Sequence, residues 1–98
     1  MNDVAEALDR LRARFLARAA DDLADLRRWA LDPPAHAEDL QRVIHRLAGA
    51  GGTFGFHRLS EFAKVAEDAL VARTSQQKAA LADVMGELER VTTANASD

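Results

Sequence analysis

The chain has 98 residues, of which 48% are hydrophobic and 30% charged, and its formal net charge is −3. This length suits one compact domain over residues 1–98 and leaves no room for a separate nucleotide-binding kinase domain. The interleaved charges argue against a nucleic-acid partner, and no apolar stretch approaches the roughly 20 residues of a membrane helix. The chain has no cysteine, so disulfides and thiolate metal sites are excluded. We therefore expect a cytoplasmic protein without membrane contact.

The N-terminal segment predicts a long amphipathic helix from about Val4 to about Leu31. Its apolar residues recur at steps of three and four, and we expect all of them to face a core: Leu8, Leu11, Phe15, Ala19, Leu23, Leu26 and Ala30. The length leaves open a bend near Ala20–Asp22, or a separate short first helix. Nearby acidic residues (Asp21, Asp22 and Asp25) indicate a solvated face rather than a cation site.

Three further helices are predicted after the break at Pro33 and Pro34. A second helix carries an inward stripe and ends in a turn near Gly55, a third follows that turn, and Thr74 and Ser75 separate it from a fourth. The inward residues of these helices are Leu40, Val43, Ile44, Leu47 and Gly51, then Leu59, Phe62, Ala63, Ala66 and Leu70, and finally Leu81, Val84, Met85, Leu88 and Val91. Residues 92–98 are expected to form a frayed polar tail. The fold class is thus an all-α, antiparallel up-and-down four-helix bundle.

His45 stands on the wrong face of the second helix for a core residue. With about 100° per residue, it projects roughly 140° away from the centre of the apolar stripe. Its neighbours on that flank are Ala48, Gly49 and Gly52, which are all small. Glycine in a helix costs about 0.8–1 kcal/mol relative to alanine, so this flank is typical of a place where another surface approaches closely.

The third helix can supply partners for this imidazole. Glu67 and Lys64 lie on one flanking stripe of that helix, which an antiparallel hairpin can bring beside His45. A carboxylate that accepts the Nδ1 proton fixes the ring tautomer and leaves Nε2 free, and an ammonium group can stabilise an arriving phosphoryl group. Taken alone, the two residues are an ordinary surface pair. The three histidines lack a helical metal-binding spacing, so no metal site is expected.

The segment from His45 to Phe56, HRLAGAGGTFGF, resembles the histidine phosphotransfer motif. That motif has a histidine, any residue, an aliphatic residue, usually lysine, a glycine, then small residues, a hydrophobic residue and a glycine. The ending GGTFGF is most similar to the phosphoacceptor domain of chemotaxis histidine kinases. One departure is clear, because Ala48 stands where the motif usually has lysine.

The resemblance implies that His45 takes a phosphoryl group on Nε2 and exchanges it with an aspartate of a response-regulator receiver domain. Glu67 matches the glutamate that holds Nδ1 in the chemotaxis kinases, and Lys64 matches another polar member of that network. The resemblance further implies a covalent carrier, without a cofactor or a nucleotide site, that a donor histidine kinase or kinase domain supplies. We expect a monomer whose receiver-binding surface contains Gln41, Arg42, Arg46, Ala48, Gly49 and Gly52.

Two alternatives to a stand-alone phosphorelay carrier remain open at this point. The chain can be a phosphoacceptor fragment of a chemotaxis-type kinase, in which case the donor is a domain of the same protein. It can also be a non-catalytic helical adaptor that binds receivers without exchanging phosphate, which Ala48 favours. The absence of the usual lysine at position 48 is compatible with slower transfer, with a different partner, or with compensation by Lys64 or Arg46.

Overall fold

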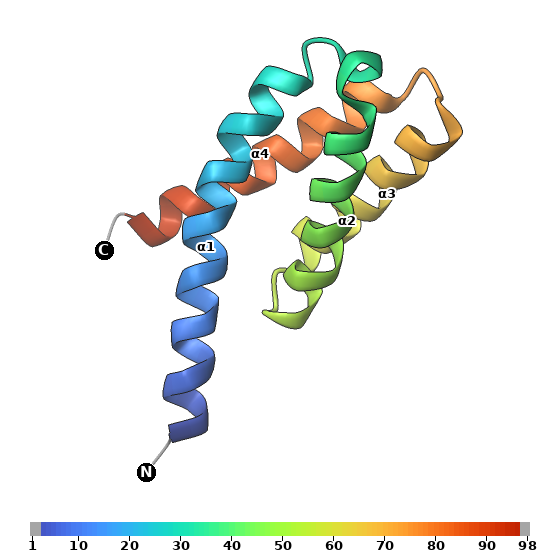
Figure 1. The fold of residues 1–98 in the computed structure, drawn as a ribbon. Coiled ribbons are helices and arrows are strands. Elements are labelled where there is room, and N and C mark those ends of the chain that lie inside the picture. The colour runs from blue at the N-terminus through green and yellow to red at the C-terminus, as the bar shows by residue number, and fades with distance from the viewer. Residues whose placement is uncertain (1–2, 97–98) are drawn as a thin grey trace.

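The computed structural model of the protein describes residues 3–96, and within them every regular element is helical. The elements in chain order are α1 (Asp3–Trp29), the short 3₁₀-helix η1 (Pro33–His36), α2 (Ala37–Thr53), α3 (His57–Ala72) and α4 (Gln77–Ala96). Figure 1 shows α2 and α3 as an antiparallel hairpin, with α4 and the C-terminal half of α1 packed beside it. The predicted all-α four-helix bundle is confirmed. None of the helices in this part of the chain is long and apolar enough to cross a membrane.

Helix α1 is one continuous helix of 27 residues, so the alternative of a separate short first helix is wrong. Its ends suit the helix dipole, since Asp3 and Glu6 lie in the first turn and Arg27 and Arg28 in the last. Only its C-terminal half joins the core, through Phe15, Ala19, Leu23 and Leu26.

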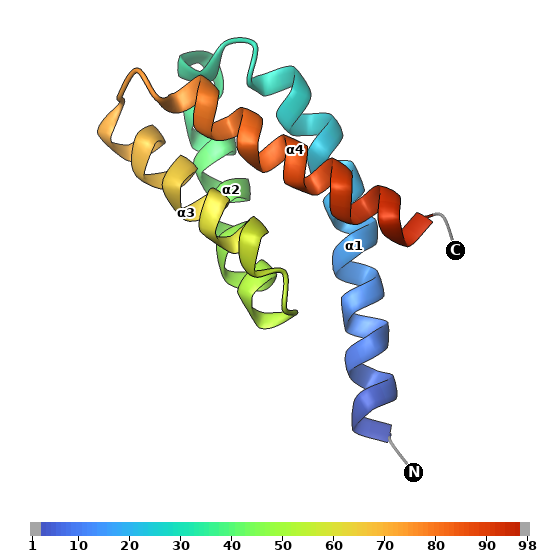
Figure 2. The ribbon, with the colours of Figure 1, turned by 180° about the vertical axis from the view of Figure 1, so that it is seen from behind.

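The N-terminal half of α1 projects away from the other helices, as Figures 1 and 2 both show. The core positions predicted for Leu8 and Leu11 are therefore wrong, because these side chains are 52% and 44% exposed. The helix is longer than the bundle that it packs on, so a periodic apolar stripe continues past the point where neighbouring helices can cover it. The molecule is elongated as a result, with extents of 50 × 23 × 19 Å.

The α2–α3 hairpin is closed by a tight turn that contains a glycine. A Cβ on Gly51 would lie 3.5 Å from the Phe56 carbonyl oxygen and from the Ser60 nitrogen, which is ordinary van der Waals contact, so the start of α3 lies directly against this side of α2. The turn needs Gly55, whose φ of +86° is a conformation that side-chain-bearing residues rarely adopt. The Phe56 N–H then donates to the Gly51 carbonyl at 2.7 Å and closes the turn. These contacts set the register in which α2 and α3 face each other.

Aromatic side chains join α1 to the turn between α2 and α3. The Phe15 ring of α1 lies 5.6 Å from that of Phe54 and 5.4 Å from that of Phe56, which ties α1 to the α2–α3 turn.

Thr74 Oγ1 accepts a hydrogen bond from the Gln76 N–H at 3.2 Å just before α4 begins. Helix α4 continues to Ala96, so the tail expected from residue 92 is helical up to there. Residues 97–98 lie outside the described part.

A buried ion pair joins α1 to α2 at the side of the core. Both guanidinium ends of Arg46 donate to the Asp22 carboxylate, at 3.0 and 2.8 Å, and Asp22 is only 5% exposed. The reading of Asp22 as part of a solvated acidic face is therefore wrong. A bidentate arginine contact satisfies both carboxylate oxygens, which is what allows an ionised side chain to be buried there.

Candidate functional site

The site begins with an imidazole on α2 and a carboxylate on α3. His45 Nδ1 lies 2.6 Å from Glu67 Oε2, across the groove between the two helices. The His45 side chain is 77% exposed, whereas Glu67 is 28% exposed. The structure thus brings together the two residues that the helical spacing placed on facing stripes. Glu67 contacts the ring at Nδ1, and the rest of the ring is open to solvent.

This geometry determines what each ring nitrogen can do. When His45 is neutral, an Nδ1–H that donates to the carboxylate leaves the Nε2 lone pair unprotonated. Nε2 points away from the one partner that holds the ring, so a reacting group can approach it. A nucleophile oriented by a second group is the general arrangement of covalent catalysis.

A shallow hollow surrounds the exposed ring. Its lining comes from α2 and α3 and combines small residues with the two charged ones: His45, Ala48, Gly49, Gly52, Thr53, Ser60, Lys64 and Glu67. A Cβ added at Gly49 would meet no atom within 4 Å, so that glycine borders open space. A Cβ added at Gly52 would lie 3.4 Å from Ser60 Oγ. Gly52 therefore faces α3 and does not border open space as Gly49 does.

Ser60 is the site residue that sequence reasoning missed. Its hydroxyl is buried and donates to the Ala48 carbonyl oxygen at 2.6 Å, one turn below the ring. This bond joins α3 to α2 at the lining of the hollow. The signal in the sequence is the spacing, because Ser60 precedes Lys64 by four residues and Glu67 by seven and so shares one stripe of α3 with them.

Lys64 lines the same hollow from one turn before Glu67 on α3. Its side chain is exposed, and it forms no ion pair or hydrogen bond with another side chain among the described residues. Its ammonium group adds positive charge to the lining of the hollow, which favours the arrival of an anion.

The other residues predicted for the receiver-binding surface fall into two groups. Arg42 is exposed on the His45 flank of α2, where it pairs with Asp39 at 2.9 Å, and Gln41 is half-buried beside it. Arg46 and Ala48, which were also predicted for this surface, lie mostly away from it. Arg46 is bound to Asp22 on the α1 side, and Ala48 is 6% exposed, so it contributes only a small edge to the hollow. Arg46 is thus not available to replace the lysine missing at position 48.

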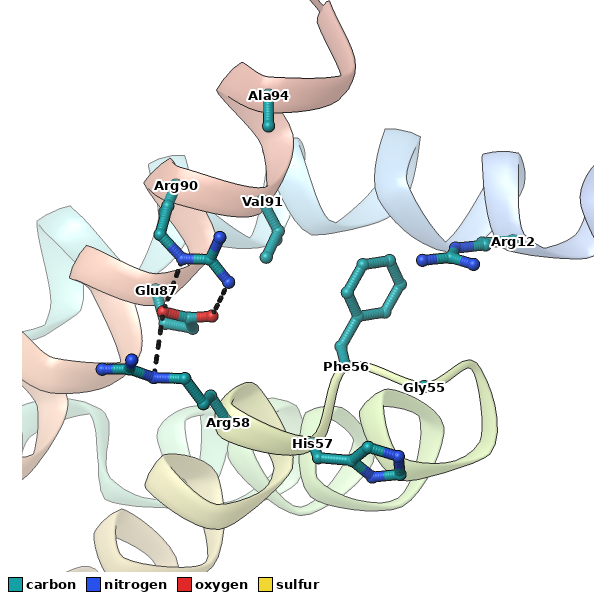
Figure 3. Close-up of a pocket in the computed structure, with 9 residues that line it drawn as sticks. All are labelled: Arg12, Gly55, Phe56, His57, Arg58, Glu87, Arg90, Val91 and Ala94. Carbon is teal, nitrogen blue, oxygen red and sulfur yellow. Dashed lines mark hydrogen bonds and ion pairs between the residues drawn. The ribbon is translucent and has the colours of Figure 1, made fainter.

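A second polar cluster lies on the far side of α3, where Figure 3 shows Glu87 of α4 between Arg90 and Arg58. Arg90 binds both carboxylate oxygens of Glu87, and Arg58 Nε lies 3.9 Å from one of them. The hydrogen bond from Arg90 lowers the pKa of Glu87 below that of an ordinary glutamate, and burial opposes this only in part. The pocket beside this cluster shares no lining residue with the hollow around His45.

Metal chemistry has no support in this part of the chain. No group of three histidine, cysteine, aspartate or glutamate side chains among residues 3–96 is arranged to hold a metal ion.

The chain matches the sequence model of a known protein family. A sequence model of the Hpt domain family covers residues 10–96, which include most of α1, all of α2, α3 and α4, and the whole His45 site. No curated protein and no solved structure matched the chain significantly. Members of this family are histidine phosphotransfer carriers of two-component phosphorelays that work with kinases and receiver domains. With a match over most of its length, and an exposed histidine on the second helix of a four-helix bundle, the chain belongs to the Hpt domain family.

Proposed function

We propose that His45 is the phosphoacceptor and that it exchanges its phosphoryl group with an aspartate of a response-regulator receiver domain. The observation that carries the proposal is the 2.6 Å contact between His45 Nδ1 and Glu67 Oε2, in which the ring stays 77% exposed. It supplies an oriented nucleophile at a surface that a second protein can reach.

The transfer step follows from the ring's protonation. The Nε2 lone pair attacks the phosphorus of the receiver's acyl phosphate, and the P–O bond to the aspartate breaks as the N–P bond forms. The aspartate leaves as a carboxylate, and His45 becomes a phosphorylated imidazolium that keeps its Nδ1 proton. Glu67 accepts that proton's hydrogen bond throughout and stabilises the positive charge that the ring gains. The same steps in reverse return the group to a receiver.

Lys64 has the supporting role that the family usually gives to the lysine at position 48. Its ammonium group lies in the same hollow and can neutralise part of the phosphoryl charge. Replacing Lys64 with alanine should slow transfer by about tenfold, a magnitude typical of losing one charged hydrogen bond. Lys78 on α4 is the only other lysine in the chain, and its alanine variant serves as the matched control.

The shape of the surface supports a transient complex. The hollow is shallow, and Gly49 has open space where a side chain would stand, so a receiver helix can approach the ring without displacing protein atoms. Complexes of this kind bury little area, and we expect rapid dissociation after transfer.

The decisive experiment measures radiolabelled phosphoryl uptake from a phosphorylated receiver. His45→Gln should abolish uptake while the far-ultraviolet circular dichroism stays that of a helical bundle. His57→Gln replaces a histidine that is also exposed, at the start of α3, and should leave uptake intact. Uptake that survives His45→Gln would reject the phosphoacceptor role.

The same assay separates the other functions. A receiver-binding adaptor would bind receivers but carry no acid-labile phosphate on the wild-type chain. A kinase phosphoacceptor fragment would be labelled faster by a histidine kinase catalytic domain with ATP than by any phosphorylated receiver.

A further inference from the structure

The N-terminal half of α1 carries an apolar stripe that nothing in the described structure covers. Val4, Leu8 and Leu11 are 75%, 52% and 44% exposed, and their spacing of four and three residues puts them on one line with Phe15. Half of the large exposed hydrophobic side chains among the described residues, three of six, belong to this one line. Exposed apolar side chains that are contiguous, rather than scattered, mark an interaction surface.

Charges along the same helix are segregated by sign. The acidic residues Asp3, Glu6 and Asp9 occupy the first turns, and the following turns carry only arginine as charged residue: Arg10, Arg12, Arg14 and Arg18. A second helix of the same sequence would face like charges if it ran parallel and opposite charges if it ran antiparallel. The helix dipoles favour the antiparallel pairing as well.

We propose that this half of α1 is a self-association surface, on which a second copy of the chain packs its own α1 in the antiparallel direction. In a two-fold arrangement centred between Leu8 and Leu11, each Leu8 packs on the other copy's Leu11. The first turn of each helix then reaches the level of Arg12 to Phe15 on the other copy. This proposal departs from the monomer expected from the sequence.

A pocket with suitable chemistry lies at that level. Figure 3 shows it between α1, the α2–α3 turn and α4, with the Phe56 ring at its centre and the Arg12 guanidinium 4.6 Å from the ring centroid. Its lining includes Arg12, Arg58 and Arg90 against the single carboxylate of Glu87, so its fixed side-chain charge is positive. Asp3 and Glu6 of a second copy are the acidic complement, and Val4 is the apolar complement of Phe56.

The two surfaces of the molecule are separate. The proposed dimer surface and the hollow around His45 share no residue, so each half of the dimer keeps its phosphotransfer site open. The inference does not rest on the proposed function, because self-association can be measured without phosphate.

Sedimentation equilibrium of the full chain tests the proposal. A short helix pair buries little area, so we expect a dissociation constant on the order of 10–100 μM. The mass should rise with concentration from the monomer value of 10.7 kDa towards twice that value. A mass that stays monomeric up to about 1 mM would overturn the proposal.

Variants locate the surface. Leu8→Glu combined with Leu11→Glu should weaken dimerisation by about 100-fold or more, because each change occurs twice in a two-fold dimer. Both side chains are exposed, so circular dichroism and phosphoryl uptake should remain those of the wild type. Val71→Glu changes an apolar side chain on α3 that is 63% exposed and should leave the mass unchanged. A dimer that survives the double substitution, or that Val71→Glu disrupts equally, would contradict the assigned surface.

Introduced cysteines test the direction of the pairing, since the chain has none of its own. Ala7 and Arg14 lie on the same edge of the stripe and face each other across an antiparallel pair. Ala7→Cys mixed with Arg14→Cys should form an intermolecular disulfide faster than either variant alone. Equal or slower cross-linking in the mixture would contradict the antiparallel arrangement.

Discussion

Two neighbouring residues of α2 reach carboxylates on opposite sides of the bundle. His45 turns towards α3 and meets Glu67, while Arg46, one residue later, turns towards α1 and meets Asp22. Both contacts are short and both join two helices. They differ in solvent access, because the His45 side chain is 77% exposed and the Asp22 side chain only 7%.

Because the two contacts differ in solvent exposure, we expect them to have different roles. Both carboxylate oxygens of Asp22 accept hydrogen bonds from Arg46, and the Asp22 side chain is buried, so the role of this pair is to hold α1 against α2. The His45–Glu67 pair leaves one ring nitrogen unused in water, where it can react. Substitutions in the first pair should therefore change the stability of the fold, and substitutions in the second should change the rate of transfer.

After the loss of His45 itself, the largest effect on transfer is expected from Glu67→Gln. The amide no longer neutralises the charge that the imidazolium gains, so transfer should slow by about 10- to 100-fold while the free energy of unfolding hardly changes. Nitrogen chemical shifts of the His45 ring should report a changed tautomer ratio. Unchanged rates and unchanged ring shifts would remove Glu67 from the mechanism.

Asp22→Ala is the counterpart on the buried side. It removes two hydrogen bonds to a guanidinium group, and we expect a loss of about 2 kcal/mol in the free energy of unfolding, measured by urea denaturation. Asp25→Ala is the control, since Asp25 pairs only with the exposed Arg28 of its own helix and should cost far less. If Asp22→Ala instead slowed transfer without loss of stability, the division of roles between the two contacts would be wrong.

Gly49→Ala tests whether a receiver docks on the hollow around His45, which Gly49 lines. The added methyl group meets no atom of the protein, so the bundle should gain about 0.5–1 kcal/mol from better helix propensity. A receiver that docks on the hollow would meet the methyl group, so transfer should slow. Gly86→Ala in α4 also has free space around the new carbon and should stabilise the fold without any effect on transfer. Equal transfer rates in the two variants would place the docking surface elsewhere.

The smallest expected effect is the contribution of Glu87 to the pH dependence of the free energy of unfolding. Its pKa in the folded protein is lowered, chiefly by the hydrogen bond from Arg90, so the unfolded chain takes up a proton there more readily than the folded chain. The contribution is therefore present above the pKa of an unfolded glutamate, about 4.3, and is lost as the pH falls through the lower folded value. The difference in unfolding free energy between the wild type and Glu87→Gln should be largest near pH 7 and shrink below about pH 4. A difference independent of pH would show that the arginines do not favour the ionised form.

Local patterns were sufficient for the helices and for the histidine. The apolar periodicity of α2, α3 and α4 predicted which residues are buried, and the angle of His45 to that stripe predicted its exposure. Its partner Glu67 followed from the spacing along a neighbouring helix, once an antiparallel hairpin was assumed. The same periodicity failed for Leu8 and Leu11, because it reports that a side of the helix is apolar and not whether another helix is there to cover it.

What the amino-acid sequence alone determined about this protein is the set of helices, their inward faces and the histidine that stands outside them. These depend on the 100° step between residues, which is local and holds in any fold. Only the tertiary structure decided that Arg46 binds Asp22 and that the Ser60 hydroxyl joins α3 to α2. It also decided that the N-terminal half of α1 extends beyond the other helices. Such contacts depend on where helices end relative to one another in space, and helical periodicity carries no information about that.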